Sequence, residues 1–182
     1  KQNQKMEITT IEQWYDILKK AESGDSSAQF EVATIYENGL NIDSLEIIKQ
    51  DIQIAFNWTK KAFENGHKEA KISYAHYLTD RSNPISVLDI ELGMKLYQEE
   101  MTNGDNYATY CLGLEYRNRQ EFEKAFDHYE KAHRNEEFFQ ELTIGMCYYY
   151  GIGVNKDKFK ALEIFKSITL PNVPPYEVDA AN

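Results

Sequence analysis

The sequence is poor in the residues that build covalent or metal-bound frameworks. Its 182 residues include only two cysteines, four histidines and four prolines. Cys111 and Cys147 are too few for a network of disulfides, and they fit a reducing or indifferent compartment. No two histidines stand four residues apart, the spacing that places a pair of zinc ligands on one helical face. We therefore predict no metal site.

The sequence also lacks the motifs of common catalytic sites. It contains no Walker loop, no GxSxG nucleophile elbow and no dinucleotide-binding glycine fingerprint. Gly151 and Gly153 form a lone GxG, which is weak evidence for a cofactor. Carboxylates are abundant, but solvated glutamates are common on helical surfaces. We predict a protein that is not an enzyme and uses no cofactor, and we infer no small-molecule substrate.

Basic residues are outnumbered, and long apolar runs are missing. Thirty acidic residues against 20 Lys and Arg give a net charge of −10. A surface of this sign repels phosphate, so we predict no nucleic-acid partner. It favours a basic protein partner, or it serves solubility alone, and both interpretations stay open. The longest uncharged run, 142–155, has 14 residues, too few to insert across a membrane.

The compartment is left open by the sequence. No charged-then-apolar segment resembling a signal peptide is visible at the amino terminus, which slightly favours the cytoplasm. The chain begins at Lys1, so a periplasmic or exported location stays open if a leader preceding Lys1 was removed.

Internal repetition is the strongest feature of the sequence. Residues 51–66 align with 89–104 without a gap, and the pattern returns at 125–132 and 161–168. We name these stretches the B helices; their anchor residues are Ala55, Gly93, Ala125 and Ala161. The stretches that precede them are the A helices; their anchor residues are Ala28, Ala70, Ala108 and Gln140. The sequence therefore predicts four A–B pairs.

The spacing of the anchors predicts how the pairs stack. Each B anchor is followed by the next A anchor after 15 residues, three times out of three, whereas the A-to-B spacing is 27, 23, 17 and 21. Stacked helical hairpins require a constant packed joint and tolerate a variable loop at one edge. Ala28, Val32 and Ile35 form one apolar helical stripe. Small residues share one further A-helix position, where helices would approach closely: Ala33, Ala75, Gly113 and Gly145.

Glycines mark the expected helix ends, and the B helices share a packed position. Gly24, Gly66 and Gly104 stand where a left-handed residue closes a last helical turn. His128 occupies the B-helix position held elsewhere by Trp58, and we predict a packed histidine there. No activating neighbour is placed beside either cysteine, and helix packing distances exceed the reach of a disulfide between them.

The last pair resembles the Sel1-like repeat. The residues that carry this resemblance are Gly145, Tyr148, Gly151, Gly153, Val154, Asp157 and Ala161. The first pair matches the same pattern at Ala28, Tyr36, Gly39, Asp51, Ala55, Trp58, Lys61, Ala62 and Gly66. Tetratricopeptide repeats are the near alternative, but their turns are shorter and lack the Gly-x-Gly-Val loop. The resemblance implies an all-α fold, a right-handed α-solenoid of about four stacked helical hairpins.

The repeats depart from the family pattern in their loops. The first has a longer insertion at 40–50, the second has Arg81-Ser-Asn-Pro84 in place of the loop, and the third is cut to 118–120. We predict a single repeat domain over 1–182. It comprises a capping helix at 11–23, four repeats at 24–168 and an extended, proline-containing tail at 169–182.

The resemblance implies that A helices line a concave groove that binds a partner protein. The candidate contact residues are Phe30, Glu37, Ile72, His76, Tyr110, Leu114, Arg117, Leu142, Met146 and Tyr149. One column of this set is apolar in all four repeats, which suits either a protein-binding strip or padding of the joints between repeats. The predicted function is a non-enzymatic interaction module. Its most specific form is a bacterial immunity-type neutraliser of a basic toxin; the alternatives are an envelope or signalling scaffold and, distantly, an enzyme.

Overall fold

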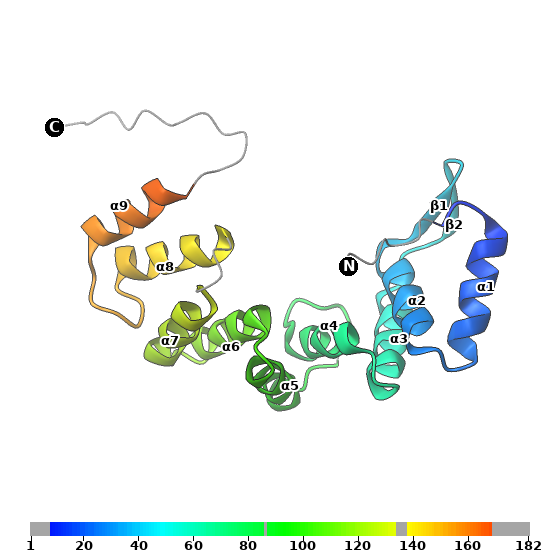
Figure 1. Ribbon diagram of the computed structural model, residues 1–182, viewed down its shortest axis with the longest axis horizontal. Helices are drawn as coiled ribbons and strands as arrows, with labels where there is room; N and C mark the ends of the chain where they lie inside the picture. The colour runs from blue at the N-terminus through cyan, green and yellow to red at the C-terminus, as the bar shows by residue number, and fades with distance from the viewer. Residues whose placement is uncertain (1–7, 86, 134–137, 169–182) are drawn as a thin grey trace. The chain divides into compact units, whose positions relative to one another are not determined.

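The computed structural model describes residues 8–85, 87–133 and 138–168 (Figure 1). Within these residues it has nine α-helices and one two-stranded sheet. The chain divides into two compact units, Lys1–Asn103 and Gly104–Asn182, which are described separately below. The predicted fold class, an all-α solenoid built of helical hairpins, is confirmed. The tail predicted at 169–182 lies outside the described residues.

The first unit holds a capping helix and two A–B pairs. Its elements are α1 (Ile11–Glu22), α2 (Ser26–Asn38), β1 (Leu40–Ile42), β2 (Leu45–Ile48), α3 (Ile52–Glu64), α4 (Lys68–Thr79) and α5 (Ile90–Thr102). Each helix packs against the next along the chain. The A helices α2 and α4 therefore pair with the B helices α3 and α5, as the anchor spacing predicts.

Short polar side chains begin these helices, and glycines follow their ends. The carboxylates of Asp25, Asp51 and Asp89 each accept a hydrogen bond from the third backbone N–H of the following helix. Gly66 and Gly104 have φ values of +83° and +88°, so α3 and α5 end before them, as predicted.

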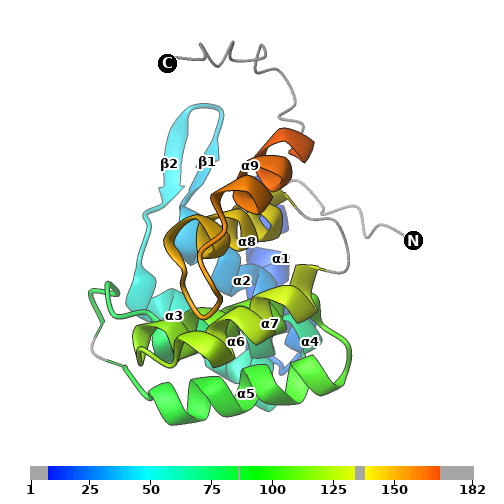
Figure 2. The same cartoon turned by 90° about the vertical axis from the view of Figure 1, so that its left-hand side faces the viewer.

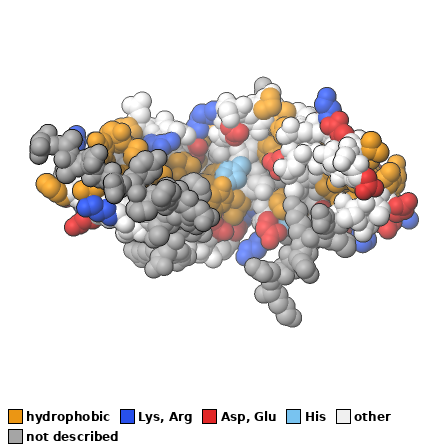
Figure 3. Space-filling view, turned by 90° about the horizontal axis from the view of Figure 1, so that it is seen from above, with side chains coloured by type: hydrophobic (Ala, Val, Ile, Leu, Met, Phe, Trp, Pro, Cys, Tyr) orange, Lys and Arg blue, Asp and Glu red, His pale blue; other side chains and the backbone are white. Residues whose placement is uncertain are grey.

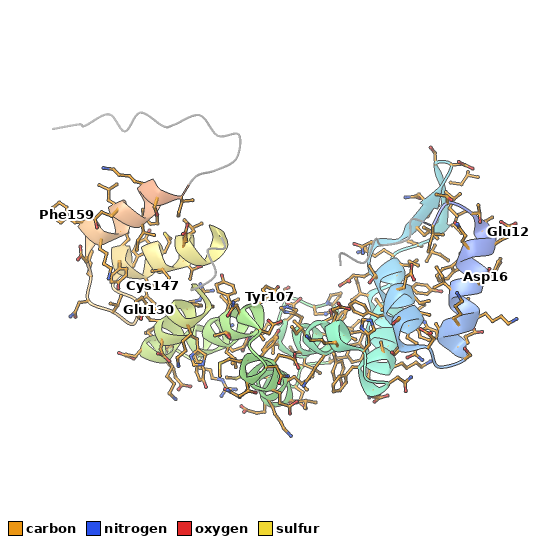
Figure 4. All side chains as sticks on the ribbon, in the orientation of Figure 1. Glu12, Asp16, Tyr107, Glu130, Cys147 and Phe159 are labelled. Carbon is orange, nitrogen blue, oxygen red and sulfur yellow. The ribbon has the colours of Figure 1, made fainter. Side chains whose placement is uncertain are left out.

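The helix α1 closes the side of the first pair. Trp14, Ile17 and Ala21 are buried against the apolar stripe of α2. Leu18 packs at the edge of this cluster. Glu12 and Asp16 lie on the opposite face of α1, away from α2 (Figure 4). An apolar inner face and a polar outer face are what a terminal capping helix needs.

The insertion at 40–50 forms a β-hairpin, which the sequence analysis did not predict. Leu40 pairs with Ile48, and Ile42 pairs with Leu45. Asp43 and Ser44 form the turn with φ values of 51° and 66°, the left-handed values that a two-residue hairpin loop requires. The hairpin packs on the core cluster of α1 and α2 through Leu40 and Ile48, and its turn projects beyond the helices of the first unit (Figures 1 and 2). Apolar residues on both sides of a two-residue polar turn therefore form a hairpin here, although the neighbouring segments are helical.

The second unit holds two further A–B pairs. Its elements are α6 (Asn106–Asn118), α7 (Phe122–His133), α8 (Phe138–Tyr150) and α9 (Lys158–Ser167). The A helices α6 and α8 pack on the B helices α7 and α9, and α7 also packs on α8. The core of this unit is one cluster of buried side chains: Ala125, Phe126, Tyr129, Ile144, Cys147, Tyr148 and Ala161.

The small-residue position lies where each A helix meets its B helix. A Cβ atom at Gly113 would stand 2.5 Å from the ring of Tyr129, and one at Gly145 would stand 2.4 Å from the ring of Phe165. Ala33 and Ala75 occupy the same position in the first unit and are fully buried. The predicted close approach of the helices is confirmed.

The cysteine and histidine predictions also hold. Cys111 and Cys147 are both buried, and they form no disulfide with each other. His128 is buried, with Nδ1 2.8 Å from the carbonyl oxygen of Lys124, and its ring packs on Tyr116. These side chains belong to the packing of α6, α7 and α8.

Two buried tyrosines at one repeat position provide a matched test of the core. The hydroxyl of Tyr97 lies 2.8 Å from Nδ1 of His76 and 3.3 Å from Oγ1 of Thr79. The hydroxyl of Tyr129 is buried without a hydrogen-bond partner among the described residues. We expect Tyr97→Phe to lower the free energy of unfolding by about 1–2 kcal/mol and Tyr129→Phe to leave it unchanged or raise it slightly. Urea denaturation of both variants tests this, and the opposite ranking would contradict it.

Candidate protein-binding site

The predicted contact residues divide between the two units. Phe30 and Glu37 lie on α2, and Ile72 and His76 lie on α4, all in the first unit. The second unit carries the others, on α6 and α8: Tyr110, Leu114, Arg117, Leu142, Met146 and Tyr149. All ten therefore lie on A helices, and each unit is treated by itself.

In the first unit, the apolar column packs the joint between hairpins. The ring of Phe30 stacks on that of His67, with centroids 4.7 Å apart. His67 in turn caps α4, its Nδ1 accepting from the backbone N–H of Ala70 at 3.3 Å. Ile72 is half-buried on the next A helix. For Phe30, the padding interpretation is therefore the one that the contacts favour.

Glu37 links the two A helices of the first unit. The hydroxyl of Tyr77 donates to Oε1 of Glu37 over 3.2 Å. Burial raises the pKa of Tyr77 well above its usual value, and the charge of Glu37 raises it further. Glu37 itself is exposed. Its carboxylate therefore fixes α2 against α4 while one side remains accessible.

His76 is a packing residue with a hydrogen bond to a B helix. It is half-buried, and its ring lies edge-on to Tyr97, with centroids 5.5 Å apart. Burial lowers the pKa of His76 below its usual 6.5, although the charge of Asp80 acts in the opposite direction. The imidazole is therefore held neutral near neutral pH.

An ion-pair cluster ties the same helix α4 to α5. Nζ of Lys71 lies 2.7 Å from Oε2 of Glu99 and 2.9 Å from Oε1 of Glu100. Partial burial disfavours the charged form of Lys71, but hydrogen bonds to the two carboxylates raise its pKa above the usual value. Glu100 is buried, so this carboxylate is charge-paired inside the joint and unavailable to a partner.

In the second unit, the predicted contact residues of α6 divide between the joint and the free surface. The hydroxyl of Tyr110 lies 3.2 Å from Oγ1 of Thr143 on α8, and its ring lies 5.5 Å from that of Tyr129. Leu114 packs at the edge of the core cluster. Arg117 is exposed at the end of α6.

The thiol of Cys147 is buried in the core of this unit. Burial raises the pKa of Cys147 to about 11, with the charge of Arg117 acting in the opposite direction. A nucleophilic cysteine needs a lowered pKa and access to solvent. Cys147 points into the helix layer from α8 (Figure 4), so it has neither property.

One exposed apolar face lies on α8. Leu142, Met146 and Tyr149 are 39%, 41% and 38% exposed and follow one another at helical spacing on one face. The opposite face carries Ile144 and Cys147, which are buried in the core. The helix has one charged residue, Glu141. A helix that is apolar all round needs cover on both faces. We call Leu142, Met146 and Tyr149 the α8 stripe.

Two neighbouring aromatic residues were missed by the sequence analysis. Tyr150 is 59% exposed and its ring lies 4.9 Å from that of Tyr149, whereas Tyr148 is buried. Phe159 on α9 is 85% exposed and points away from α8 (Figure 4). Hydrophobic side chains gather at the left-hand end of the space-filling view, where Figure 1 places these helices (Figure 3).

A signal for Phe159 was present in the repeat register. The other three B helices carry polar residues at its position: Gln53, Glu91 and Glu123. Because the equivalent residues in the other B helices are polar, packing within the repeat does not require an apolar residue at position 159. Lys158, beside it, lies 5.4 Å from the centroid of the Tyr149 ring.

The described residues give no sign of a metal centre or a membrane span. Residues 8–85, 87–133 and 138–168 contain no group of three His, Cys, Asp or Glu placed to bind a metal ion. In the same part of the chain, each helix is too short or too polar to cross a bilayer.

The chain belongs to the Sel1 repeat family. The Sel1 repeat pattern matches residues 26–67, 106–134 and 144–167, together more than half of the 182 residues. The segment between the first two matches holds α4 and α5, whose loop departs from the pattern. Sel1 repeats generally mediate protein–protein interaction, and proteins of the family are typically non-enzymatic. No curated protein sequence matches this chain.

Two solved structures show the same fold. The chain resembles c5321, a protective antigen of uropathogenic Escherichia coli, with 25% identity and a TM-score of 0.64 over 84% of this chain. It resembles a Sel1 repeat protein of Oxalobacter formigenes with 26% identity and a TM-score of 0.63 over 85% of this chain. This chain spans 32% of the length of the first relative and 61% of the second.

The lowered pKa of His76 predicts a pH dependence of stability. Between its lowered pKa and 6.5, the unfolded chain binds more protons at this site than the native state. The free energy of unfolding should therefore fall as the pH drops through about 6.5, and this contribution should level off below the lowered pKa. Urea denaturation at about six pH values from about 7.5 to 5 measures this free energy. It should fall less steeply with decreasing pH in His76→Gln than in the wild type. An identical slope in wild type and variant would contradict this.

Proposed function

We propose that this chain is a non-enzymatic module that binds a partner protein, with the α8 stripe as its principal contact. The observation that carries the proposal is a row of large apolar side chains on one exposed face of a helix whose other face is core. An apolar surface that solvent leaves uncovered is typical of protein interaction sites. The family's general role as an interaction module supports the same function.

The residue types of the stripe suit protein recognition. Tyrosine contributes a large, rigid contact area with a polar end, and it is common among residues that dominate binding energy. Met146 has a flexible, polarisable side chain that adapts to the partner's shape. Tyr110, Leu114 and Arg117 on α6 belong to the proposed surface as its border, since the contact of Tyr110 with Thr143 brings α6 to α8.

In the first unit, the proposed contacts are weaker. Phe30 and His76 are engaged in joint packing, Ile72 is half-buried, and Glu37 is shared with Tyr77. We assign these four residues a supporting role, in which they hold the A helices in place. Direct contact with a partner is assigned chiefly to the second unit.

We propose further that the partner is a basic protein. A net charge of −10 accelerates association with a positively charged surface and disfavours acidic partners. The most specific form of this proposal is an immunity-type protein that neutralises a basic toxin by covering its active surface. The support for it is the acidic charge together with the exposed stripe.

A scaffold is the second candidate, favoured by the β1–β2 hairpin. Leu45 is exposed beside the turn of this hairpin, which projects beyond the helices of the first unit. An assembly protein that contacts two partners would use both this hairpin and the α8 stripe. An immunity protein with one target would need the stripe alone.

The first prediction from this proposal compares two exposed tyrosines. Tyr149→Ala should lower the activation free energy of dissociation of the partner by at least about 2 kcal/mol, because it removes an apolar anchor from the contact. Tyr15→Ala on the outer face of α1 is the matched control and should leave dissociation unchanged. Surface plasmon resonance with the partner captured from the native host measures both. Equal effects of the two changes, or none, would rule out the stripe as the contact.

The second prediction separates the charge from the apolar anchors. Raising salt from about 50 to 500 mM should slow association about tenfold or more, while dissociation changes little, because long-range charge acts mainly before contact. If the partner is a toxin, coexpression of the wild-type chain should restore growth of cells that carry it, and Tyr149→Ala should not. Association that is insensitive to salt would contradict a basic partner.

A further inference from the structure

Two lysines of α9 lie over two consecutive tyrosines of α8. Nζ of Lys160 lies 4.1 Å from the centroid of the Tyr148 ring and donates to its hydroxyl over 2.6 Å. Nζ of Lys158 lies 5.4 Å from the centroid of the Tyr149 ring. A lysine ammonium at this distance is attracted by the negative face of a tyrosine ring. Tyr148 is buried in the core, whereas Tyr149 belongs to the α8 stripe, so the second contact concerns the proposed binding surface.

The backbone fixes the start of α9 beside the end of α8. The N–H of Asp157 donates to the carbonyl oxygen of Tyr148 over 2.9 Å. The carboxylate of Asp157 then caps α9, because it accepts from the backbone N–H of Lys160 over 2.9 Å. Lys158 is the first residue of the helix that this cap begins. Its side chain therefore starts from a defined point next to the last turn of α8.

The repeat register shows that this pair is peculiar to the last hairpin. Lys158 stands three residues before its B anchor, a position that is apolar in the other hairpins: Ile52, Ile90 and Phe122. Tyr149 stands nine residues after its A anchor, a position held elsewhere by Glu37, Thr79 and Arg117. Both positions depart from the other repeats in the one hairpin where the two side chains meet. Packing of the repeat therefore does not require a lysine at position 158.

A second ring contacts the same tyrosine. The ring of Tyr150 lies edge-on to that of Tyr149, with centroids 4.9 Å apart and an angle of 79° between the planes. Tyr149 thus keeps more than a third of its surface exposed while its ring has two partners within its own hairpin. An exposed side chain that is ordered before binding loses less conformational entropy when a partner covers it.

We propose that Lys158 is a positioning residue of the α8 stripe, whose ammonium holds the ring of Tyr149 in one rotamer before a partner binds. Lys158 is itself exposed, so the contact covers no core surface, and its effect falls on the order of the binding surface. This order is a property of the free chain. Only its consequence for binding rests on the proposed function.

Nuclear magnetic resonance of the full chain tests the order of Tyr149 without a partner. With isotope-labelled tyrosine, couplings across χ1 of Tyr149 report whether one rotamer or a mixture is populated. The wild type and Lys158→Arg, which keeps the cation, should each show one dominant rotamer. In Lys158→Gln, the ratio of this rotamer to the others should fall about two- to fivefold, because the attraction of the cation is lost.

The control is a second exposed lysine of the same helix. Lys166→Gln removes the same charge from α9 and should keep the wild-type couplings. The amide signal of the buried Ile144 should be unchanged in every variant, which shows that the core is intact. If Lys158→Gln disturbs this signal, Lys158→Met provides the same comparison. Equal couplings in wild type and Lys158→Gln, or a mixture of rotamers already in the wild type, would overturn the proposal.

A double-mutant cycle tests the consequence for binding. With the partner captured from the native host, surface plasmon resonance should give a higher Kd for Lys158→Gln, by at most the about fivefold change in rotamer ratio. Lys158→Arg should restore the wild-type Kd. In the Tyr149→Ala background, Lys158→Gln should have no further effect, because the ring that it positions is gone.

The cycle also separates this inference from the proposed function. An equal effect of Lys158→Gln in both backgrounds would mean that Lys158 contacts the partner directly, and it would overturn the positioning role. If Tyr149→Ala leaves binding unchanged, the stripe is not the contact and the proposed function fails. The couplings of Tyr149 in the free chain then still decide whether Lys158 orders its ring.

Discussion

Each A helix can pack on its B helix only because their crossing point has almost no side chain. At Gly113 and Gly145, even a methyl group would overlap an aromatic ring of the partner helix. Close packing of this kind fixes the angle and height of the pair, since interiors tolerate little change in volume. The joint from a B helix to the next A helix is packed by aromatic contacts instead: Phe56 lies against Tyr74 and Tyr77, and Phe126 lies against Tyr148. The 15-residue spacing in the sequence is constant because this joint requires a fixed length of chain.

This constraint decides which surfaces remain for function. A B helix uses its faces for its own A helix and the next one, whereas an A helix keeps a third face that no joint requires. In the first unit that face is occupied by contacts such as Phe30 on His67 and Glu37 with Tyr77. On α8 it stays open and apolar, because Leu142, Met146 and Tyr149 each keep more than a third of their surface exposed. In the second unit α6 also has such a contact, Tyr110 with Thr143, so the open face belongs to α8, the last A helix among the described residues.

The repeat register predicted the fold because its signals are local and additive. Anchor spacing, glycines after helices and the small-residue position each report on the backbone, and all agreed. The β1–β2 hairpin was missed because its residues were treated only as an insertion, although Asp43 and Ser44 between apolar residues are a hairpin signal. Whether each side chain of the apolar A-helix column is packed or exposed could not be predicted, since this depends on which ring lies opposite that side chain. His67 opposite Phe30 is a neighbour that spacing alone does not identify as a stacking partner.

The claim that α8 is the contact surface is tested most directly by site-specific photo-crosslinking in the native host. A photoreactive phenylalanine analogue at Met146 should form a covalent product with one partner protein, because the side chain projects into the proposed interface. The same analogue at Tyr15, on the exposed face of α1, should give none. A product from position 15 and none from position 146 would contradict the account and move the contact to the first unit.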